Sequence, residues 1–159
     1  MSVTDSNVVS AWDVLAGCEV SGACAVLGGG LVGTETAEFL AQKDLKVSIV
    51  EMLDQIATGE SETVMPLIKK DFEEHDVKEY VNTRVNSIEN NVIHAVNTKD
   101  ESEVTIEADT IVNALGSKKN LFDDSKLTVP FVYVGDCSGE RTADISAAIR
   151  SGYQAGNEI

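Results

Sequence analysis

The sequence lacks the features that mark several large classes of protein. Only two of its 159 residues are proline, and 43% are hydrophobic, so a disordered chain or an array of linkers is excluded. No apolar run approaches the roughly 20 residues that a membrane-spanning helix requires. Residues Met1 to Asp5 show no basic segment leading into an apolar one, as a secretory signal would. We therefore expect a soluble, cytoplasmic protein with enough chain for one domain with a hydrophobic core.

Cysteine and positive charge are both scarce. Cys18, Cys24 and Cys137 have neither metal-ligand spacing nor a CxxC arrangement, which argues against an iron–sulfur site or a disulfide framework and predicts ordinary thiols. Twelve basic residues stand against 27 acidic ones, for a net charge of −15. A surface this acidic repels phosphate backbones and anionic lipid, so we expect neither nucleic acid nor a membrane as a partner.

The usual sets of catalytic side chains are missing as well. The sequence shows no Ser/His/Asp set, no paired carboxylates at helical spacing and no cluster of metal ligands. His75 and His94 fall in a helix end and a short strand, where we expect both to be surface residues. We therefore predict no catalytic residue and no metal site in this chain.

A β-α-β unit of about thirty residues is the strongest pattern present. The apolar run Ala23–Leu27 is stopped by three glycines and reads as a buried strand. Helical spacing follows over Leu31–Gln42, and the β-branched run Lys46–Val50 predicts a second strand. The glycines thus lie at a junction between strand and helix, which is the context in which a glycine-rich loop binds a nucleotide.

Each glycine of this loop has a predicted task in binding a dinucleotide. Gly28 permits the tight turn out of the strand, and Gly30 lets the backbone approach a pyrophosphate. Gly33 lets the helix pack closely on the sheet, while the amides at the helix start face the anion. The predicted phosphate-binding residues are Gly28, Gly29, Gly30, Leu31, Val32 and Gly33.

An acidic residue completes the signal. Glu51 ends the second strand, eighteen positions after Gly33, where its carboxylate can accept hydrogen bonds from both hydroxyls of the adenosine ribose. It would also repel a 2′-phosphate, and no arginine follows within residues 51–57, so NAD(H) is favoured over NADP(H). We assign Met52, beside it, to the same site. Two alternatives stay open: a strand–helix turn with an incidental glutamate, and an S-adenosylmethionine site, which usually has looser glycine spacing.

The pattern changes in the second half of the chain. Short alternating runs over residues 84–107, with Asn90-Asn91 as a tight turn, predict an antiparallel meander. An amphipathic helix precedes it over residues 62–74, with Pro66 in its first turn. The fold class we predict is α/β: a Rossmann-like, doubly wound parallel sheet in three layers, with this meander inserted.

The chain divides into three parts on this interpretation. Residues 1–20 form an N-terminal arm in which Trp12 packs against the domain, and residues 21–116 form the NAD(H)-binding domain with the meander. Residues 117–159 contain a predicted strand over Phe131–Val134 and a last helix over 143–159. Whether that strand joins the parallel sheet is left open.

Several separate motifs resemble one family of enzymes. "VVSAWDVLAG", "GGGLVGTETAEFL" and "VSIVEML" resemble the nicotinamide-nucleotide domain of the pyridine nucleotide–disulfide oxidoreductase superfamily. More narrowly, they are similar to the C-terminal part of the NADH:flavin oxidoreductases of the 2,4-dienoyl-CoA reductase and enoate reductase type, which are NADH oxidase-like flavoproteins. The resemblance runs from about Val8 to Ile159, almost the whole chain.

The resemblance implies roles for further residues. Glu35 matches an acidic position near the nicotinamide end, and Ala114, Leu115 and Gly116 match a turn beside the bound dinucleotide. The run "VYVGD", which ends in Gly135 and Asp136, resembles the second flavin motif, whose Asp meets the ribityl chain of FAD. In such enzymes NADH gives a hydride to FAD, and this transfer needs orientation more than a protein acid or base.

Departures from the family limit what the chain can do. No glycine loop precedes residue 28, and the flavin-bearing barrel and the cysteine cluster of the family are missing. Asp136 is therefore half of a flavin site, and FAD is expected only in the intact enzyme. We expect a fragment that binds NADH, has the FAD domain and barrel as partners, and is inactive alone. A stand-alone NAD-binding or redox-sensing module is the alternative; a purely structural role would require that no dinucleotide binds. The final substrate and the oligomeric state stay open.

Overall fold

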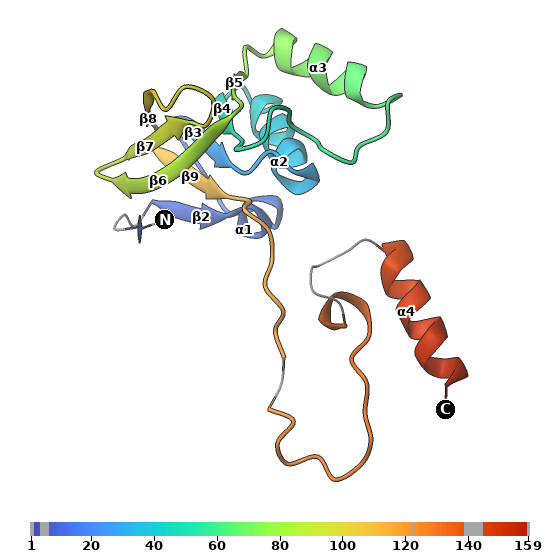
Figure 1. Ribbon diagram of the computed structural model, residues 1–159. Helices are drawn as coiled ribbons and strands as arrows, with labels where there is room; N and C mark the ends of the chain where they lie inside the picture. Colours follow the sequence, from blue (N-terminus) through green and yellow to red (C-terminus); the bar gives the residue numbers. More distant parts are fainter. Residues whose placement is uncertain (1, 4–6, 122, 139–144, 159) are drawn as a thin grey trace. The chain divides into compact units, whose positions relative to one another are not determined.

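The computed structural model describes residues 2–3, 7–121, 123–138 and 145–158 (Figure 1). The chain forms two units, Met1–Gly116 and Ser117–Ile159, and each has its own internal packing. Within the described residues, no helix is both long and apolar enough to cross a membrane.

A five-stranded parallel sheet forms the centre of the first unit. Its strand order is β2-β9-β3-β4-β5, and every neighbouring pair is parallel. β3 therefore lies in the middle, and β2 and β5 are the edges. The strands are β2 (Val8–Ser10), β3 (Ala23–Leu27), β4 (Lys46–Val50), β5 (Lys78–Tyr80) and β9 (Thr110–Asn113).

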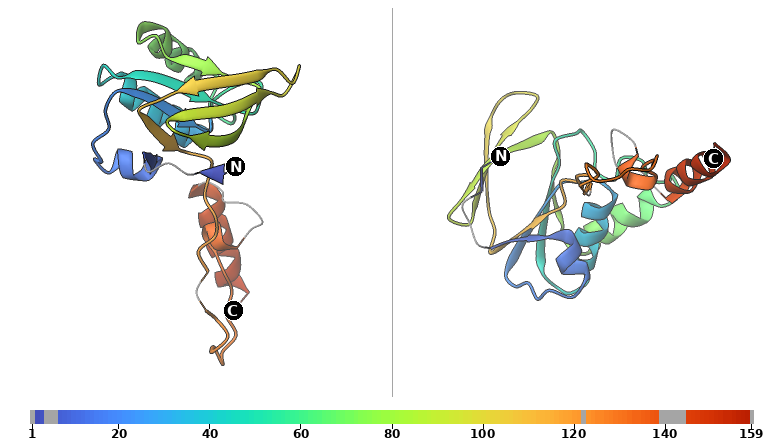
Figure 2. Two further views of the ribbon diagram at one scale, coloured as in Figure 1. Left: turned by 90° about the vertical axis from the view of Figure 1, so that its left-hand side faces the viewer. Right: turned by 90° about the horizontal axis from the view of Figure 1, so that it is seen from below.

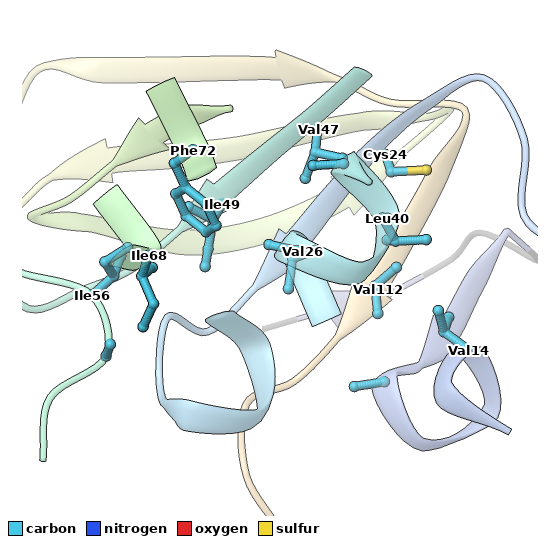
Figure 3. Packing of buried hydrophobic residues seen from close by; sticks show 14 residues of the cluster. Val14, Cys24, Val26, Leu40, Val47, Ile49, Ile56, Ile68, Phe72 and Val112 are labelled. Carbon is cyan, nitrogen blue, oxygen red and sulfur yellow. The ribbon is translucent and has the colours of Figure 1, made fainter. Parts of the chain in front are cut away.

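Helices cover one face of this sheet. They are α1 (Ala11–Leu15), α2 (Leu31–Ala41) and α3 (Met65–Glu74), which has Pro66 in its first turn as predicted. Leu40 of α2 packs in one buried cluster with Val26 of β3 and Phe72 of α3 (Figure 3).

The opposite face of the sheet is covered by the predicted meander. β6 (Thr83–Glu89), β7 (Val92–Asn97) and β8 (Glu103–Glu107) are antiparallel, and β1 (Ser2–Val3) pairs in parallel with β6. A second buried cluster joins Leu27 and Ile111 of the parallel sheet to Ile93 of the meander. The first unit therefore has three layers: helices, parallel sheet and meander (Figure 2).

These observations confirm the predicted fold class. The structure is α/β and Rossmann-like, with the meander forming the third layer. The Asn90-Asn91 turn is also confirmed: both residues have positive φ, 53° and 65°, as the two central positions of a type I′ hairpin turn require.

The residues of β2 and α1 pack into the first unit more closely than a separate N-terminal arm would. β2 pairs with β9 along the edge of the sheet, and Ala11 and Val14 of α1 are buried. The predicted packing of Trp12 is wrong: its side chain is 63% exposed, because α1 turns Ala11 and Val14 toward the core.

The described residues of the second unit contain little regular structure. Its described elements are a 3₁₀ turn, η1 (Gly135–Cys137), and α4 (Ile145–Asn157). The strand predicted over Phe131–Val134 is wrong: the structure assigns no strand to these residues. Instead, the Tyr133 hydroxyl donates a 2.9 Å hydrogen bond to Asp124.

Leu40 tests the helix-to-sheet core. Leu40→Ala should lower the free energy of unfolding by about 2–5 kcal/mol, because a fully buried side chain leaves a cavity. The matched variant Leu67→Ala, on an α3 residue that is 64% exposed, should change it by less than about 0.5 kcal/mol. Urea denaturation measures both. Equal losses from the two variants would contradict the packing of α2 on the sheet.

Candidate dinucleotide-binding edge of the parallel sheet

Three strand ends meet along one edge of the parallel sheet. Leu27, the last residue of β3, pairs with Val50 of β4 on one side and with Asn113 of β9 on the other. β3, β4 and β9 therefore end side by side, and the segments that follow them all begin at the carboxyl edge of the sheet. Open α/β sheets bind their ligands at this carboxyl edge.

A cleft of about 420 Å³ opens at this edge. The structure brings together residues that the sequence places in three separate segments. Predicted site residues that line the cleft are Gly28, Gly30, Glu51, Met52, Ala114, Leu115 and Gly116. The lining also contains residues that sequence analysis missed, namely Val50, Thr83, Arg84 and Val85.

The remaining predicted residues lie outside this lining. The first turn of α2 follows the loop directly, so its backbone amides stay available to a ligand even though its side chains do not line the cleft. The predicted site residues that do not line the cleft are Gly29 in the loop, Leu31, Val32, Gly33 and Glu35 on α2, and Gly135 and Asp136 in η1 of the second unit.

Three of the four glycines are required by the protein itself. Gly28 has a φ of 98°, and a Cβ there would lie 2.7 Å from the carbonyl oxygen of Ala114. A Cβ on Gly29 would lie 2.9 Å from the side chain of Glu51. A Cβ on Gly33 would collide with the carbonyl oxygen of Gly28. The loop, α2 and the end of β9 are therefore in backbone contact.

Gly30 differs from these three. No heavy atom lies within 4 Å of the position that a Cβ on Gly30 would occupy. Its φ of −68° is one that any residue adopts. Neither packing nor backbone conformation therefore requires glycine here, and the side chain is missing at a point that faces the open cleft.

The start of α2 presents unsatisfied amides. The first hydrogen bond of the helix runs from the Thr34 amide to the Gly30 carbonyl, at 2.9 Å, and Gly30 has no side chain that could cap the helix. Among the described residues, nothing accepts a hydrogen bond from the amides of Leu31 and Val32. Such amides and the helix dipole favour an anion at this end.

Glu51 is held in place by backbone amides. Its Oε2 accepts a 2.6 Å hydrogen bond from the Gly29 amide, and its Oε1 accepts a 2.8 Å bond from the Leu53 amide. A carboxylate offers about four acceptor positions, so about two remain for a ligand. The side chain is thus fixed at the end of β4 with capacity to accept further hydrogen bonds.

Apolar side chains surround the same strand ends. Leu31, Met52, Leu53 and Leu115 are between 43% and 56% exposed, although large apolar side chains are usually buried. Planar rings such as adenine or nicotinamide could cover this surface.

Two titratable groups near the sheet have shifted pKa values. Burial raises the pKa of Glu38 on α2, and the negative charges of Asp71 and Glu35 raise it further. Burial also raises the pKa of the Cys24 thiol, with Asp109 adding to the shift. A raised pKa favours the protonated thiol over the reactive thiolate.

Three of the four missed cleft residues come from the start of the meander, and the fourth, Val50, ends β4. Thr83, Arg84 and Val85 lie more than thirty positions after Glu51, outside the glycine loop and its acid. Their place at the cleft depends on how the meander packs on the sheet, and no local sequence pattern encodes that. The one available signal was that a strand begins there, directly after the parallel strand β5.

The sequence is similar to one family of known proteins and to individual members of related enzymes. The sequence profile of the pyridine nucleotide-disulphide oxidoreductase family matches residues 12–152. The chain is 44% identical over 157 residues to a bilirubin reductase of Mediterraneibacter gnavus, and 32% identical over 164 residues to an NADH oxidase of Thermoanaerobacter brockii. Each alignment covers 96% of this chain and 24% of the relative, so the chain spans about a quarter of the length of these proteins.

Solved structures share the fold over almost the whole chain. A 2-naphthoyl-CoA reductase in complex with 2-naphthoyl-CoA matches with a TM-score of 0.75 and 25% identity. That match covers 98% of this chain and 24% of the reductase chain.

Gly33 and Gly30 form a matched pair for testing the loop geometry. Gly33→Ala should lower the free energy of unfolding by about 1–3 kcal/mol, because the added methyl group collides with backbone. Gly30→Ala should lower it by less than about 1 kcal/mol, the loss expected from a poorer N-cap alone. Denaturant titration of both variants is the measurement. A larger loss of unfolding free energy for Gly30→Ala than for Gly33→Ala would contradict the conclusion that Gly30 faces open space and Gly33 faces the backbone of Gly28.

Proposed function

Because the chain belongs to the pyridine nucleotide-disulphide oxidoreductase family, we propose that it is the NADH-binding part of a flavin-dependent oxidoreductase. The observation that carries this proposal is Gly30. Its missing side chain opens space beside free helix amides, at a position where the fold does not need a glycine. A pyrophosphate that approaches the backbone at this point explains the glycine.

The residues present fit NADH along the length of the cleft. The pyrophosphate would be held by the amides at the start of α2, which already favour an anion. The adenosine ribose would donate its two hydroxyls to Glu51, whose carboxylate keeps about two acceptor positions after bonding Gly29 and Leu53. Exposed Met52 and Leu115 supply apolar contact for the rings.

Glu51 favours NADH over NADPH for an electrostatic reason. A 2′-phosphate on the same ribose would place negative charge against a carboxylate held by two backbone amides. The carboxylate cannot turn away without losing both bonds, so the repulsion stays. Like charges brought together in a partly buried site cost far more than in bulk water.

Our proposal assigns this chain a binding and orienting task. NADH, when bound, supplies a hydride that a flavin accepts. Among the described residues that line the cleft, Glu51 is the one acidic residue and Arg84 the one positively charged residue. Hydride transfer between stacked rings does not require either of them to donate or accept a proton. The chain would fix the position of the dinucleotide and keep its pyrophosphate and ribose in place.

The flavin is assigned to a longer protein rather than to this chain alone. Asp136 lies in η1, where the Gly135 amide donates a 2.8 Å hydrogen bond to Ser151, but a single acid in a turn is not a complete flavin site. The chain also spans only 24% of its relatives, which supports a flavin domain built mainly by other sequence. We propose that residues 117–159 contribute to that domain and residues 21–116 bind the nucleotide.

One observation favours a second candidate, a stand-alone NAD-binding or redox-sensing module. The described residues that line the cleft belong to the unit Met1–Gly116, which favours a module that binds the nucleotide through this unit. A neighbouring reading frame that encodes a barrel and a cysteine cluster would favour the oxidoreductase. An isolated gene would favour the module.

Calorimetric titration with NADH, NADPH and FAD tests the proposed function. The chain should bind NADH more tightly than NADPH. Glu51→Gln should weaken NADH binding by about 5- to 30-fold, because neutral acceptors bond the ribose less strongly, and should narrow the gap between the two nucleotides. Gly30→Ala should weaken both by about 10-fold or more, since its methyl group fills the space meant for the pyrophosphate.

The controls separate loss of binding from loss of fold. Both variants should still unfold in one cooperative thermal transition, lowered by a few degrees at most for Gly30→Ala, whose side chain faces open space, and somewhat more for Glu51→Gln, whose single oxygen can accept from only one of the two backbone amides. Failure of the parent chain to bind any nucleotide would refute the proposal. Tighter binding of NADPH than of NADH would refute the role of Glu51.

A further inference from the structure

Arg84 is the one basic side chain in the described lining of the cleft. It is the second residue of β6 and is exposed, while Thr83 before it is buried. The rest of the lining consists of glycines, apolar residues, one threonine and Glu51. The cleft therefore contains a single guanidinium in a chain whose net charge is −15.

Backbone hydrogen bonds fix Arg84 beside the ribose acid. The Glu51 amide donates to the Tyr80 carbonyl, and the Thr83 amide donates to the Glu51 carbonyl, both at 2.8 Å. The Asn82 amide donates to the Leu53 carbonyl at 2.7 Å. The segment that leads into β6 thus runs along the segment after β4, and Arg84 lies one residue beyond this contact.

The guanidinium of Arg84 serves no visible purpose in the fold. Within the described part of the chain it forms neither an ion pair nor a side-chain hydrogen bond, although the chain has 27 acidic residues. Its strand neighbour on β7 is the apolar Val96. An exposed arginine without a carboxylate partner, at the wall of a binding cleft, is available to a ligand.

We propose that Arg84 recognises the adenine base by stacking its guanidinium on the ring. This inference rests on the proposed function, in which Glu51 binds the adenosine ribose. Adenine is bonded directly to that ribose, so it must lie next to Glu51, where the backbone contacts hold Arg84. A planar guanidinium stacks well on aromatic faces. In the proposed binding mode the pyrophosphate is held at the start of α2 and Glu51 disfavours a 2′-phosphate, so adenine is the group beside Glu51 that Arg84 would contact.

The test compares the two halves of the dinucleotide. Calorimetric titration of the full chain and of Arg84→Ala uses NADH, ADP-ribose, which contains the adenine half, and reduced nicotinamide mononucleotide. Arg84→Ala should weaken NADH and ADP-ribose to the same degree, by about 2- to 30-fold, the range of a cation–π contact. It should leave the binding of the mononucleotide unchanged.

Lys46→Ala is the matched control for net charge. Lys46 is exposed at the amino end of β4, away from Glu51 at the other end, and its removal costs the same positive charge. Lys46→Ala should bind ADP-ribose like the parent chain at about 0.1 M salt, and the loss in Arg84→Ala should persist at about 0.5 M salt. Thermal unfolding confirms that both variants fold.

Each contrary outcome has a distinct meaning. If Lys46→Ala weakened ADP-ribose binding as much as Arg84→Ala, Arg84 would contribute only its positive charge. The same would follow if the loss of binding in Arg84→Ala disappeared at high salt. Either result would overturn the stacking proposal. A parallel titration of Arg84→Ala with NADPH that shows a loss for NADPH alone would assign the guanidinium to a phosphate and would also overturn the stacking proposal. Unchanged ADP-ribose binding in Arg84→Ala would overturn the inference and leave the proposed function standing. If the parent chain binds neither NADH nor ADP-ribose, both fail.

Discussion

The contact between the first turn of α2 and the turn after β3 is the constraint on which the candidate site depends. α2 reaches the carboxyl edge of the sheet because Gly33 has no side chain between the helix and the Gly28 carbonyl. The same contact brings the end of β9 against the loop, since a Cβ on Gly28 would meet the Ala114 carbonyl. With a larger residue at either glycine, the helix amides would move away from the strand ends, and the cleft would lose the wall that favours an anion.

The two faces of the parallel sheet contribute differently to the site. The helix face supplies the buried cluster around Leu40 and Phe72 and sets the position of the free amides. The opposite face is covered by the meander, whose first residues reach the cleft. A segment that a purely topological description treats as an insertion thus forms one wall of the candidate site, and Arg84 comes from it.

The sequence predicts well those parts of the structure that local patterns encode. The loop from Gly28 to Gly33 and the acid at Glu51 belong to one strand–helix–strand unit, and all are found at one sheet edge. Arg84 could not be found in this way, because its position depends on backbone bonds between residues 51–53 and 80–83. Phe131–Val134 shows the reverse problem: its composition suits a strand, but strand propensity depends on the tertiary surroundings, which composition does not contain.

The two amide bonds to Glu51 have a consequence for the timing of binding. A carboxylate anchored through both oxygens keeps one rotamer without a ligand, so a nucleotide that binds as proposed would meet an acceptor that is already oriented. Little conformational freedom is then lost on association. Related ligands should reach such a rigid acceptor at similar rates, and the chain should distinguish them by how long each one stays.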